Sequence, residues 1–149
     1  MTPAEQKALD ILSKDLETDE GRVPYVYLDS LGYQTIGVGI LVDKRKGGKL
    51  FPEEIDFILT NRIKRILPDA QAESWYPAVA NDPVRLAGVL NMHFQMGSGV
   101  DEKFANSFKF IAAKDWAKAG ANLRASLWAK QTPARADRVI RMIETGKAA

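Results

Sequence analysis

One short stretch of strand-forming sequence, residues 23–42, most constrains the fold, because the other apolar runs of the chain have helical spacing. Residues 23–28 and 33–42 are rich in β-branched and aromatic side chains. The intervening segment, residues 29–32 (Asp-Ser-Leu-Gly), has the composition of a tight turn. The sequence therefore predicts one β-hairpin in an otherwise helical protein, which is a mostly helical α+β fold.

Apolar residues that recur every three or four positions predict helices on both sides of the hairpin. Pro3 fits the first helical position and Gly21 fits the position just past a helix end, so Glu20 is expected at the end of the first helix. The last helix is expected to take Thr132 as its cap. The expected helices cover residues 2–20, 52–70, 82–97, 106–113, 115–127 and 132–146.

The length of 149 residues is enough for one domain with a real core, or for two small lobes that share a helix. The helix expected at residues 52–70 is the best candidate for a segment that links two lobes. The segment 82–97 is apolar on most sides, so it is expected to be buried in the second lobe.

The composition excludes several kinds of active site. The chain has no cysteine, which excludes disulfides, thiolate catalysis and cysteine-ligated metals. Its one histidine, His93, cannot build a multi-histidine metal site, so we expect neither a metal nor another cofactor. His93 lies in an apolar segment and is expected to pack in the core rather than to carry a proton in catalysis.

No stretch approaches the roughly 20 apolar residues that span a bilayer. The N-terminus has no basic segment followed by an apolar run, so we expect neither stable membrane insertion nor a signal peptide. The net charge is +2, but residues 84–149 hold 11 Lys and Arg against 5 Asp and Glu. This excess favours an anionic polymer, and a plain solvated surface explains it at least as well. No nucleic-acid-binding motif accompanies the charge, so nucleic acid is not an expected partner.

Side chains alternate across a strand, so the segment 33–42 is expected to have two faces. Tyr33, Thr35, Gly37 and Gly39 are expected on one face, and mainly apolar side chains on the other. A face with a ring, a hydroxyl and two glycines would let a large ligand lie close to the backbone. The glycines could instead mark a twist or a bulge, and the sequence leaves both explanations open.

Two carboxyl groups flank the first strand of the hairpin, Glu20 before it and Asp29 in its turn. Cleavage of a glycosidic bond needs one protonated and one ionised carboxyl group, because the transition state resembles an oxocarbenium ion. The negative end of a helix dipole favours the protonated form of Glu20, whereas a polar turn suits an ionised Asp29. Thr35 could help Asp29 to hold a water on the far face of the sugar. Such pairs are common, so these residues alone do not decide the function.

Three parts of the sequence match one family in the correct order across nearly the whole chain. The first has Glu-Gly at 20–21, Tyr-Leu-Asp at 27–29 and Gly-Tyr-Gln-Thr-Ile-Gly-Val-Gly at 32–39. The second is Asn-Met-His-Phe-Gln-Met-Gly at 91–97, and the third, at 128–140, begins Trp-Ala-Lys-Gln-Thr-Pro. They resemble the E-G, Y-x-D, G-Y-x-T-I-G-x-G, N-M-x-F-Q-M-G and W-x-x-Q-T-P-x-R-A-x-R-V-I motifs of the phage-type lysozymes typified by the T-even phage endolysin.

The resemblance implies a single lysozyme domain, residues 1–149, of two lobes with a saccharide cleft between them. An N-terminal helix and a small α/β lobe would reach to about residue 51, a linking helix would cover about residues 52–70, and a helical lobe about residues 71–149. The resemblance implies that Glu20 is the general acid, and that Asp29, together with Thr35, positions and activates the attacking water. The family hydrolyses the β-1,4 bond between N-acetylmuramic acid and N-acetylglucosamine by single displacement with inversion. The residues expected to bind substrate are Tyr33, Gly37, Gly39, Gln95 and Trp128, the last two at the C-terminal side of the cleft.

Two features depart from the family pattern. Ile40 directly follows the Thr-Ile-Gly-Val-Gly strand, where the family often has a histidine, so an apolar contact is expected in place of an ion pair. The segment 43–51, between the strand and the linking helix, is much shorter than in the type member. This shortening leaves the extent of the cleft open.

The resemblance also implies a biological setting. We expect a monomeric phage endolysin, made in the host cytoplasm, released by a separate pore-forming membrane protein (a holin), and acting on bacterial peptidoglycan in the periplasm or outside the cell. A lytic transglycosylase is the near alternative, although that chemistry needs no water-positioning pair. A non-catalytic wall-binding module is the alternative from another class.

Overall fold

A computed structural model of the chain describes residues 2–42, 50–97 and 99–148. The backbone forms two compact units, Met1–Phe57 (unit 1) and Ile58–Ala149 (unit 2). The charged loop expected at residues 43–49 lies outside the described residues. Within the described ranges, no helix is long and apolar enough to cross a membrane.

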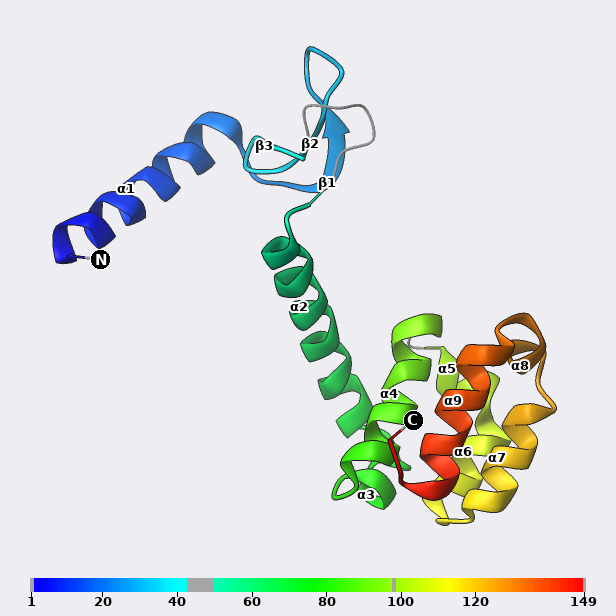
Figure 1. Ribbon diagram of the computed structural model, residues 1–149. Helices are drawn as coiled ribbons and strands as arrows, with labels where there is room; N and C mark the ends of the chain where they lie inside the picture. Colours follow the sequence, from blue (N-terminus) through cyan, green and yellow to red (C-terminus); the bar gives the residue numbers. More distant parts are fainter. Residues whose placement is uncertain (1, 43–49, 98, 149) are drawn as a thin grey trace. The chain divides into compact units, whose positions relative to one another are not determined.

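Unit 1 begins with helix α1 (Pro3–Glu20), which ends at the residue expected from the sequence. Three strands follow it: β1 (Val23–Leu28), β2 (Gln34–Gly37) and β3 (Ile40–Leu41) (Figure 1). They form an antiparallel sheet in the order β1-β2-β3. Tyr27 of β1 pairs with Thr35 of β2, and Ile36 of β2 pairs with Ile40 of β3. The predicted hairpin is present, followed by a third strand that was not predicted.

The segment 33–42 is not one continuous strand, and here the expectation from the sequence is wrong. β2 ends at Gly37, the chain turns, and β3 returns antiparallel. Gly37 has φ +69° and Gly39 has φ +59°, a left-handed backbone region that glycine enters without steric cost. A Cβ on Gly37 would lie 3.8 Å from Ile40 Cδ1, which is an ordinary contact. Backbone conformation, rather than space for a ligand, therefore explains why residue 37 is a glycine. Gly39 follows the end of β2, so it is not on the face of that strand as predicted.

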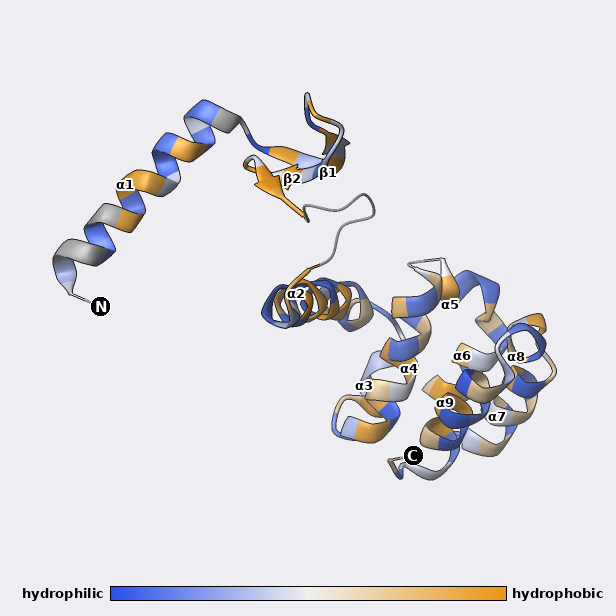
Figure 2. Cartoon of the chain, turned by 45° about the horizontal axis from the view of Figure 1, so that its top comes forward, coloured by the Kyte–Doolittle hydropathy of each residue, from blue (hydrophilic) through white to orange (hydrophobic). Residues whose placement is uncertain are grey.

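Helix α1 and the sheet region share an apolar surface. Hydrophobic residues recur along α1 between hydrophilic ones (Figure 2). Leu12 and Leu16 of α1 line a pocket of about 400 Å³ together with Val38 and Ile40. Ile40, which stands where the family often has a histidine, thus lies among apolar side chains.

Helix α2 (Pro52–Gln71) begins at the expected proline and continues from unit 1 into unit 2. The other helices described in unit 2 are α3 (Tyr76–Val79), α4 (Pro83–Met96), α5 (Val100–Lys103), α6 (Ala105–Ala112), α7 (Trp116–Arg124), α8 (Leu127–Gln131) and α9 (Pro133–Thr145) (Figure 1). They bury one hydrophobic core, whose largest members include Trp75, Met92, Ile111, Leu123, Ile140 and Ile143.

Most of the predicted helices agree with the observed ones to within a few residues at their ends. Asp82 caps α4 by accepting a hydrogen bond from the Arg85 amide at 3.0 Å, and α4 is buried through Val89, Met92 and His93. The short helices α3, α5 and α8 were not predicted, because four or five residues carry too little periodicity. The helix predicted at 115–127 accordingly ends early, at Arg124.

Thr132 occupies the N-cap position of α9, as predicted, but its side chain does not make the capping hydrogen bond. Its hydroxyl donates instead to the carbonyl oxygen of Trp128 at 3.1 Å, and it makes no side-chain cap bond to α9. Helix α8 ends directly before α9, and the same Trp128 carbonyl also accepts the Thr132 amide at 2.9 Å, so the hydroxyl is its second donor.

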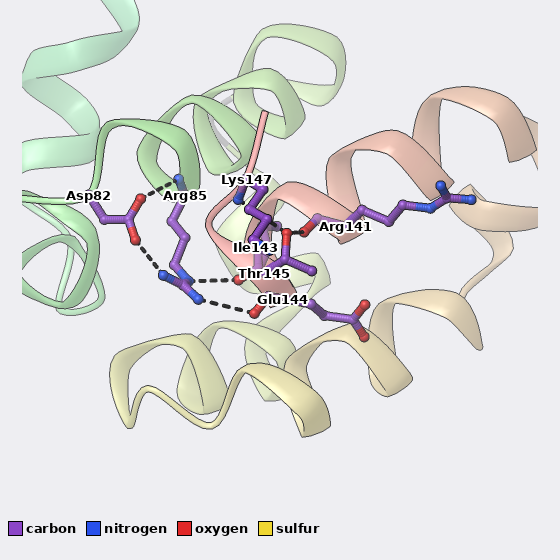
Figure 3. A network of polar contacts seen from close by, with 7 residues as sticks. All are labelled: Asp82, Arg85, Arg141, Ile143, Glu144, Thr145 and Lys147. Carbon is purple, nitrogen blue, oxygen red and sulfur yellow. Dashed lines mark hydrogen bonds and ion pairs between the residues drawn. The ribbon is translucent and has the colours of Figure 1, made fainter. Parts of the chain in front are cut away.

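Arg85 joins the start of α4 to the end of α9 (Figure 3). Its Nε donates to the carbonyl oxygen of Ile143 at 2.9 Å, and its Nη2 donates to that of Glu144 at 3.0 Å. Its Nη1 pairs with Asp82, and its guanidinium lies over the Trp116 ring, 4.5 Å from the ring centroid. One arginine therefore satisfies two carbonyl groups that the end of α9 leaves without backbone partners.

Candidate active site

Asp29 directly follows β1, at the start of the turn that leads to β2. Its Oδ1 accepts hydrogen bonds from the backbone amides of Leu31 and Tyr33, both at 2.9 Å. Its own amide donates to the carbonyl oxygen of Tyr33 at 2.9 Å. Aspartate commonly bonds in this way to amides of its own turn. These bonds fix the carboxylate through one oxygen, and Oδ2 makes no hydrogen bond to any described residue, so Oδ2 is available to a water or a ligand.

Thr35 lies in β2, opposite Tyr27 of β1. Its side chain is 4% exposed, and it is the only buried residue in the described part of unit 1. The hydroxyl donates to the carbonyl oxygen of Tyr33 over 3.4 Å, which is long for such a bond. The hydroxyl is therefore weakly held by the protein and can exchange this partner for a water.

Asp29 and Thr35 line one pocket of unit 1, with a volume of about 390 Å³. This volume is in the range of sites that hold small ligands. The complete lining is Tyr27, Asp29, Leu31, Tyr33, Thr35, Gly39 and Leu41. Four residues singled out from the sequence therefore lie together: Asp29, Tyr33, Thr35 and Gly39.

Two of the sequence-predicted residues of unit 1 are not in this lining. Gly37 is absent from it, in keeping with the turn that its backbone makes. Glu20 is the last residue of α1, and two residues separate it from the start of β1, as expected. Its side chain lies outside the described part of the structure.

Gln95 and Trp128 lie in unit 2 and contact each other. Trp128 Nε1 donates to Gln95 Oε1 at 2.9 Å, and the tryptophan side chain is 4% exposed. Its ring packs edge-on against Phe104, with 6.1 Å between centroids. Trp128 also lines a surface pocket of about 510 Å³ with polar residues that include Asn106 and Asn122. Because the Trp128 side chain is almost fully buried, it is better placed to support the surface of this pocket than to stack against a ligand.

Sequence reasoning missed Tyr27, Leu31 and Leu41 as lining residues of the unit 1 pocket. Tyr27 belongs to a quoted motif, but its position opposite Thr35 follows only from the strand register. Leu41 reaches the pocket because β3 folds back on β2, and nothing in the simple alternation of residues 33–42 predicts this reversal. Within the described residues, no group of three or more His, Asp or Glu side chains could hold a metal ion.

Comparison with known proteins finds relatives that identify the family of this chain. Two probable T4-type lysozymes of Dictyostelium discoideum are 33% and 30% identical to this chain, and each alignment covers 88% of the chain and 92% of the relative. The chain belongs to the T4-type lysozyme family. No family model matches the sequence. The mostly helical α+β fold agrees with this membership.

Two phage proteins are also similar to this T4-type lysozyme over part of their length. The pre-baseplate central spike protein Gp5 of Enterobacteria phage T4 is 31% identical over 91% of the chain, which corresponds to 28% of Gp5. The peptidoglycan hydrolase gp36 of Pseudomonas phage phiKMV is 31% identical over 74% of the chain, which corresponds to 11% of gp36. The lysozyme sequence thus aligns with whole relatives and with segments of larger phage proteins.

Proposed function

We propose that this chain hydrolyses the β-1,4 bond between N-acetylmuramic acid and N-acetylglucosamine in peptidoglycan, by acid-assisted attack of water in a single displacement. As a T4-type lysozyme it is a glycoside hydrolase, and a relative named for peptidoglycan hydrolysis supports this polymer as its substrate. The observation that most supports the mechanism is the common pocket of Asp29 and Thr35 in unit 1.

In this mechanism Asp29 and Thr35 position the water. Asp29 Oδ1 is already occupied by two backbone amides, which leaves Oδ2 to accept a proton from the water. Thr35 shares the pocket and offers a weakly held hydroxyl as a second contact for that water. An attacking water held on one face of the sugar gives inversion at the anomeric carbon.

Glu20 is the proposed general acid. The oxygen atom that leaves the anomeric carbon must gain a proton as the bond breaks, and a carboxylic acid at the end of α1 is suited to supply it. The bond between the anomeric carbon and this oxygen breaks while the bond from water forms. Asp29 takes the proton of the water and Glu20 gives its own proton to the departing sugar, so the reaction is balanced.

The proposed substrate contacts come from both units. In unit 1, Tyr33 and Gly39 share the pocket with the water-positioning pair, and Gly37 shapes the turn beside it. In unit 2, we assign Gln95 to the wall polymer and Trp128 to the support of Gln95 through their hydrogen bond.

The proposed setting is that of a phage endolysin. The protein would be made in the host cytoplasm as a monomer, released by a separate holin, and would act on the cell wall in the periplasm or outside. The phage origin of two similar proteins supports this setting. The release step can be tested by expressing this chain in bacterial cells with and without a co-expressed holin. Lysis on induction only when the holin is present supports release by the holin.

The decisive experiment compares the wild type with Glu20→Gln on purified peptidoglycan. Removal of the proton donor is expected to lower the rate by about 10²–10⁴-fold while the circular dichroism spectrum stays unchanged. The matched control is Glu53→Gln, an exposed residue in the first turn of α2, which is expected to lyse as fast as the wild type. Full activity of Glu20→Gln would exclude Glu20 as the acid.

Analysis of the products separates hydrolysis from its alternatives. Reducing-end muramic acid, formed with inversion, supports the proposed mechanism. A 1,6-anhydro product would identify a lytic transglycosylase and would exclude the water-attacking step. Binding of the wall without release of fragments would identify a non-catalytic module.

A further inference from the structure

Unit 2 contains a second polar pocket that the proposed hydrolysis does not use. It has a volume of about 490 Å³, which is suited to a small molecule. The ionisable side chains in its lining are Arg62, Arg65, Asp69, Glu73, His93 and Asp101. All lie in unit 2, and none belongs to the pocket of Asp29 and Thr35.

His93 lines this pocket, and its Nε2 is a buried polar atom with no hydrogen-bond partner among the described residues. The His93 side chain is 5% exposed. The nearest carboxylate oxygen, Asp101 Oδ1, is 3.5 Å away and already accepts a hydrogen bond from Trp75 Nε1 at 2.6 Å. The imidazole is packed by Trp75 and Phe108, with ring centroids at 5.4 and 5.9 Å. A buried nitrogen without a hydrogen bond is unusual and costs stability, so this side of the pocket lacks a polar partner that a ligand could supply.

Four further charged side chains around the pocket have no side-chain partner in the part of the chain that the structure describes. Arg62, Arg65, Asp69 and Glu73 make no side-chain hydrogen bond or ion pair with any described residue. Arg65 and Asp69 are four positions apart on α2, a spacing at which helical side chains often pair, yet no ion pair forms. The pocket therefore offers free groups of both signs.

The balance of these charges indicates the kind of ligand. Burial lowers the pKa of His93, and this effect outweighs the opposing influence of Asp101, Glu73 and Asp69, so the imidazole is neutral at pH 7. The lining then has two positive and three negative groups. A purely anionic ligand would leave the carboxylates unpaired, and a purely cationic ligand would leave the arginines unpaired. A ligand that has an ammonium and a carboxylate matches both sets.

We propose that this pocket binds an α-amino acid group, with its carboxylate toward Arg62 and Arg65, its ammonium toward the three carboxylates, and a hydrogen bond to His93 Nε2. The group could belong to a free amino acid or to the amino-acid end of a peptide in the wall polymer. The site is independent of the proposed hydrolysis, because its residues and its test involve no catalytic group.

The single histidine makes binding directly observable in the full-length protein. L-lysine is titrated while the imidazole resonances of His93 are followed by NMR, with two matched analogues beside it. 1,5-Diaminopentane is lysine without the carboxylate, and 6-aminohexanoate is lysine without the α-ammonium. We expect a saturable shift of the His93 signals with lysine, and binding weaker by about tenfold for each analogue, since each loses charged hydrogen bonds. Unchanged His93 signals with lysine, or an analogue that binds as tightly, would overturn the proposal.

Variants test the two halves of the site separately. Arg65→Gln is expected to weaken lysine binding by about tenfold, so that the variant no longer binds lysine more tightly than 1,5-diaminopentane. Asp69→Asn is expected to weaken lysine binding to a similar extent, so that this variant no longer binds lysine more tightly than 6-aminohexanoate. Arg138→Gln, an exposed substitution on α9 outside the pocket, is the matched control and should bind lysine as the wild type does. Wild-type affinity in both pocket variants would contradict the assignment.

Competition identifies the source of the ligand. Soluble wall fragments with intact peptides, and the same fragments with their peptides removed, are added to the lysine complex. Displacement by the first alone assigns the site to a wall peptide, and displacement by neither assigns it to a free amino acid. Equal displacement by both would show that sugar, not an amino acid group, occupies the pocket, and the proposal would be wrong.

Discussion

The carboxylate of Asp29 is oriented by the backbone of its own turn, so its geometry is set before any substrate arrives. Two amides hold Oδ1, and the turn between β1 and β2 holds those amides. A base that is oriented in advance needs no reorganisation during the reaction, which is a general source of catalytic rate. The same residue therefore has a structural and a proposed chemical role, and substitutions can separate them.

Asp29→Asn separates the two roles of this side chain. The amide oxygen can still accept from Leu31 and Tyr33, so the turn should persist, whereas the negative charge proposed to take a proton from water is lost. We expect the rate on purified peptidoglycan to fall by about 10²-fold or more, with an unchanged melting temperature. Asp56→Asn, an exposed change in α2, is the control.

Thr35→Ala is the companion variant in the same assay and should reduce the rate less than Asp29→Asn does, because Thr35 contributes a neutral contact rather than the base. Equal activity of Asp29→Asn and the wild type would exclude Asp29 from water activation.

His93 gives the protein a pH-dependent stability. Burial holds the pKa of His93 below its usual value of about 6.5, against the pull of Asp69, Glu73 and Asp101. The unfolded chain therefore binds more protons than the folded chain as the pH falls below about 6.5, and the free energy of unfolding decreases there. In urea denaturation from about pH 7.5 to 5, we expect this decrease in the wild type and a flatter profile in His93→Gln. Parallel profiles would mean that His93 titrates alike in both states.

At the scale of helices and strands, the sequence predicts those elements that are marked by a local, periodic pattern of residues. The long helices and β1 follow from apolar spacing and strand-forming residues. Pro52 starts α2 because a proline fits the first helical position, and Asp82 starts α4 because its carboxylate accepts a hydrogen bond from a helix amide. The sequence does not show that residues 33–42 reverse direction, because Gly37 and Gly39 fit a ligand-facing strand as well as a turn. Thr132 similarly has a cap-forming side chain, and only the position of α8 directs its hydroxyl elsewhere.

The packing of α9 on α4 depends on Arg85, a residue that no local pattern singles out. Its guanidinium reaches carbonyl groups 58 and 59 residues further along the chain. Arg85→Lys keeps the charge but cannot reproduce the forked contacts or the stacking on Trp116. We expect a loss of about 1–3 kcal/mol in the free energy of unfolding, measured by chemical denaturation. Arg138→Lys, exposed on α9, should change it by less than about 0.5 kcal/mol, and equal effects of the two would refute the role of Arg85.

For the whole molecule, the sequence predicts the components of the candidate site better than their contacts. The motif resemblance leads to Asp29, Thr35, Gln95 and Trp128 by position in the chain. The pocket around the first two and the hydrogen bond between the last two are properties of the folded chain, since they join residues that local periodicity does not relate. The polar pocket around His93 has no sequence signal at all, because its residues come from three separate helices and the segment after α2.

The two units bury very different amounts of hydrophobic surface, and this difference predicts unequal local stability. Unit 2 encloses fully buried side chains such as Met92, Ile111 and Ile140, whereas Thr35 is the only buried residue in the described part of unit 1. Backbone amides in α4 and α9 should therefore exchange with deuterium at least about a hundredfold more slowly than amides in α1 and β1, as followed by mass spectrometry of peptides.

A core substitution makes this last prediction sharper. Met92→Ala leaves a cavity and should destabilise unit 2 by about 2–5 kcal/mol. If the units open independently, exchange accelerates in α4, α6 and α9 while the rates in α1 and β1 stay as they were, because local openings of unit 1 do not require its neighbour to unfold. If all segments of the wild type exchange at one rate and accelerate together in Met92→Ala, the chain unfolds as a single cooperative block and the predicted difference between the units is wrong.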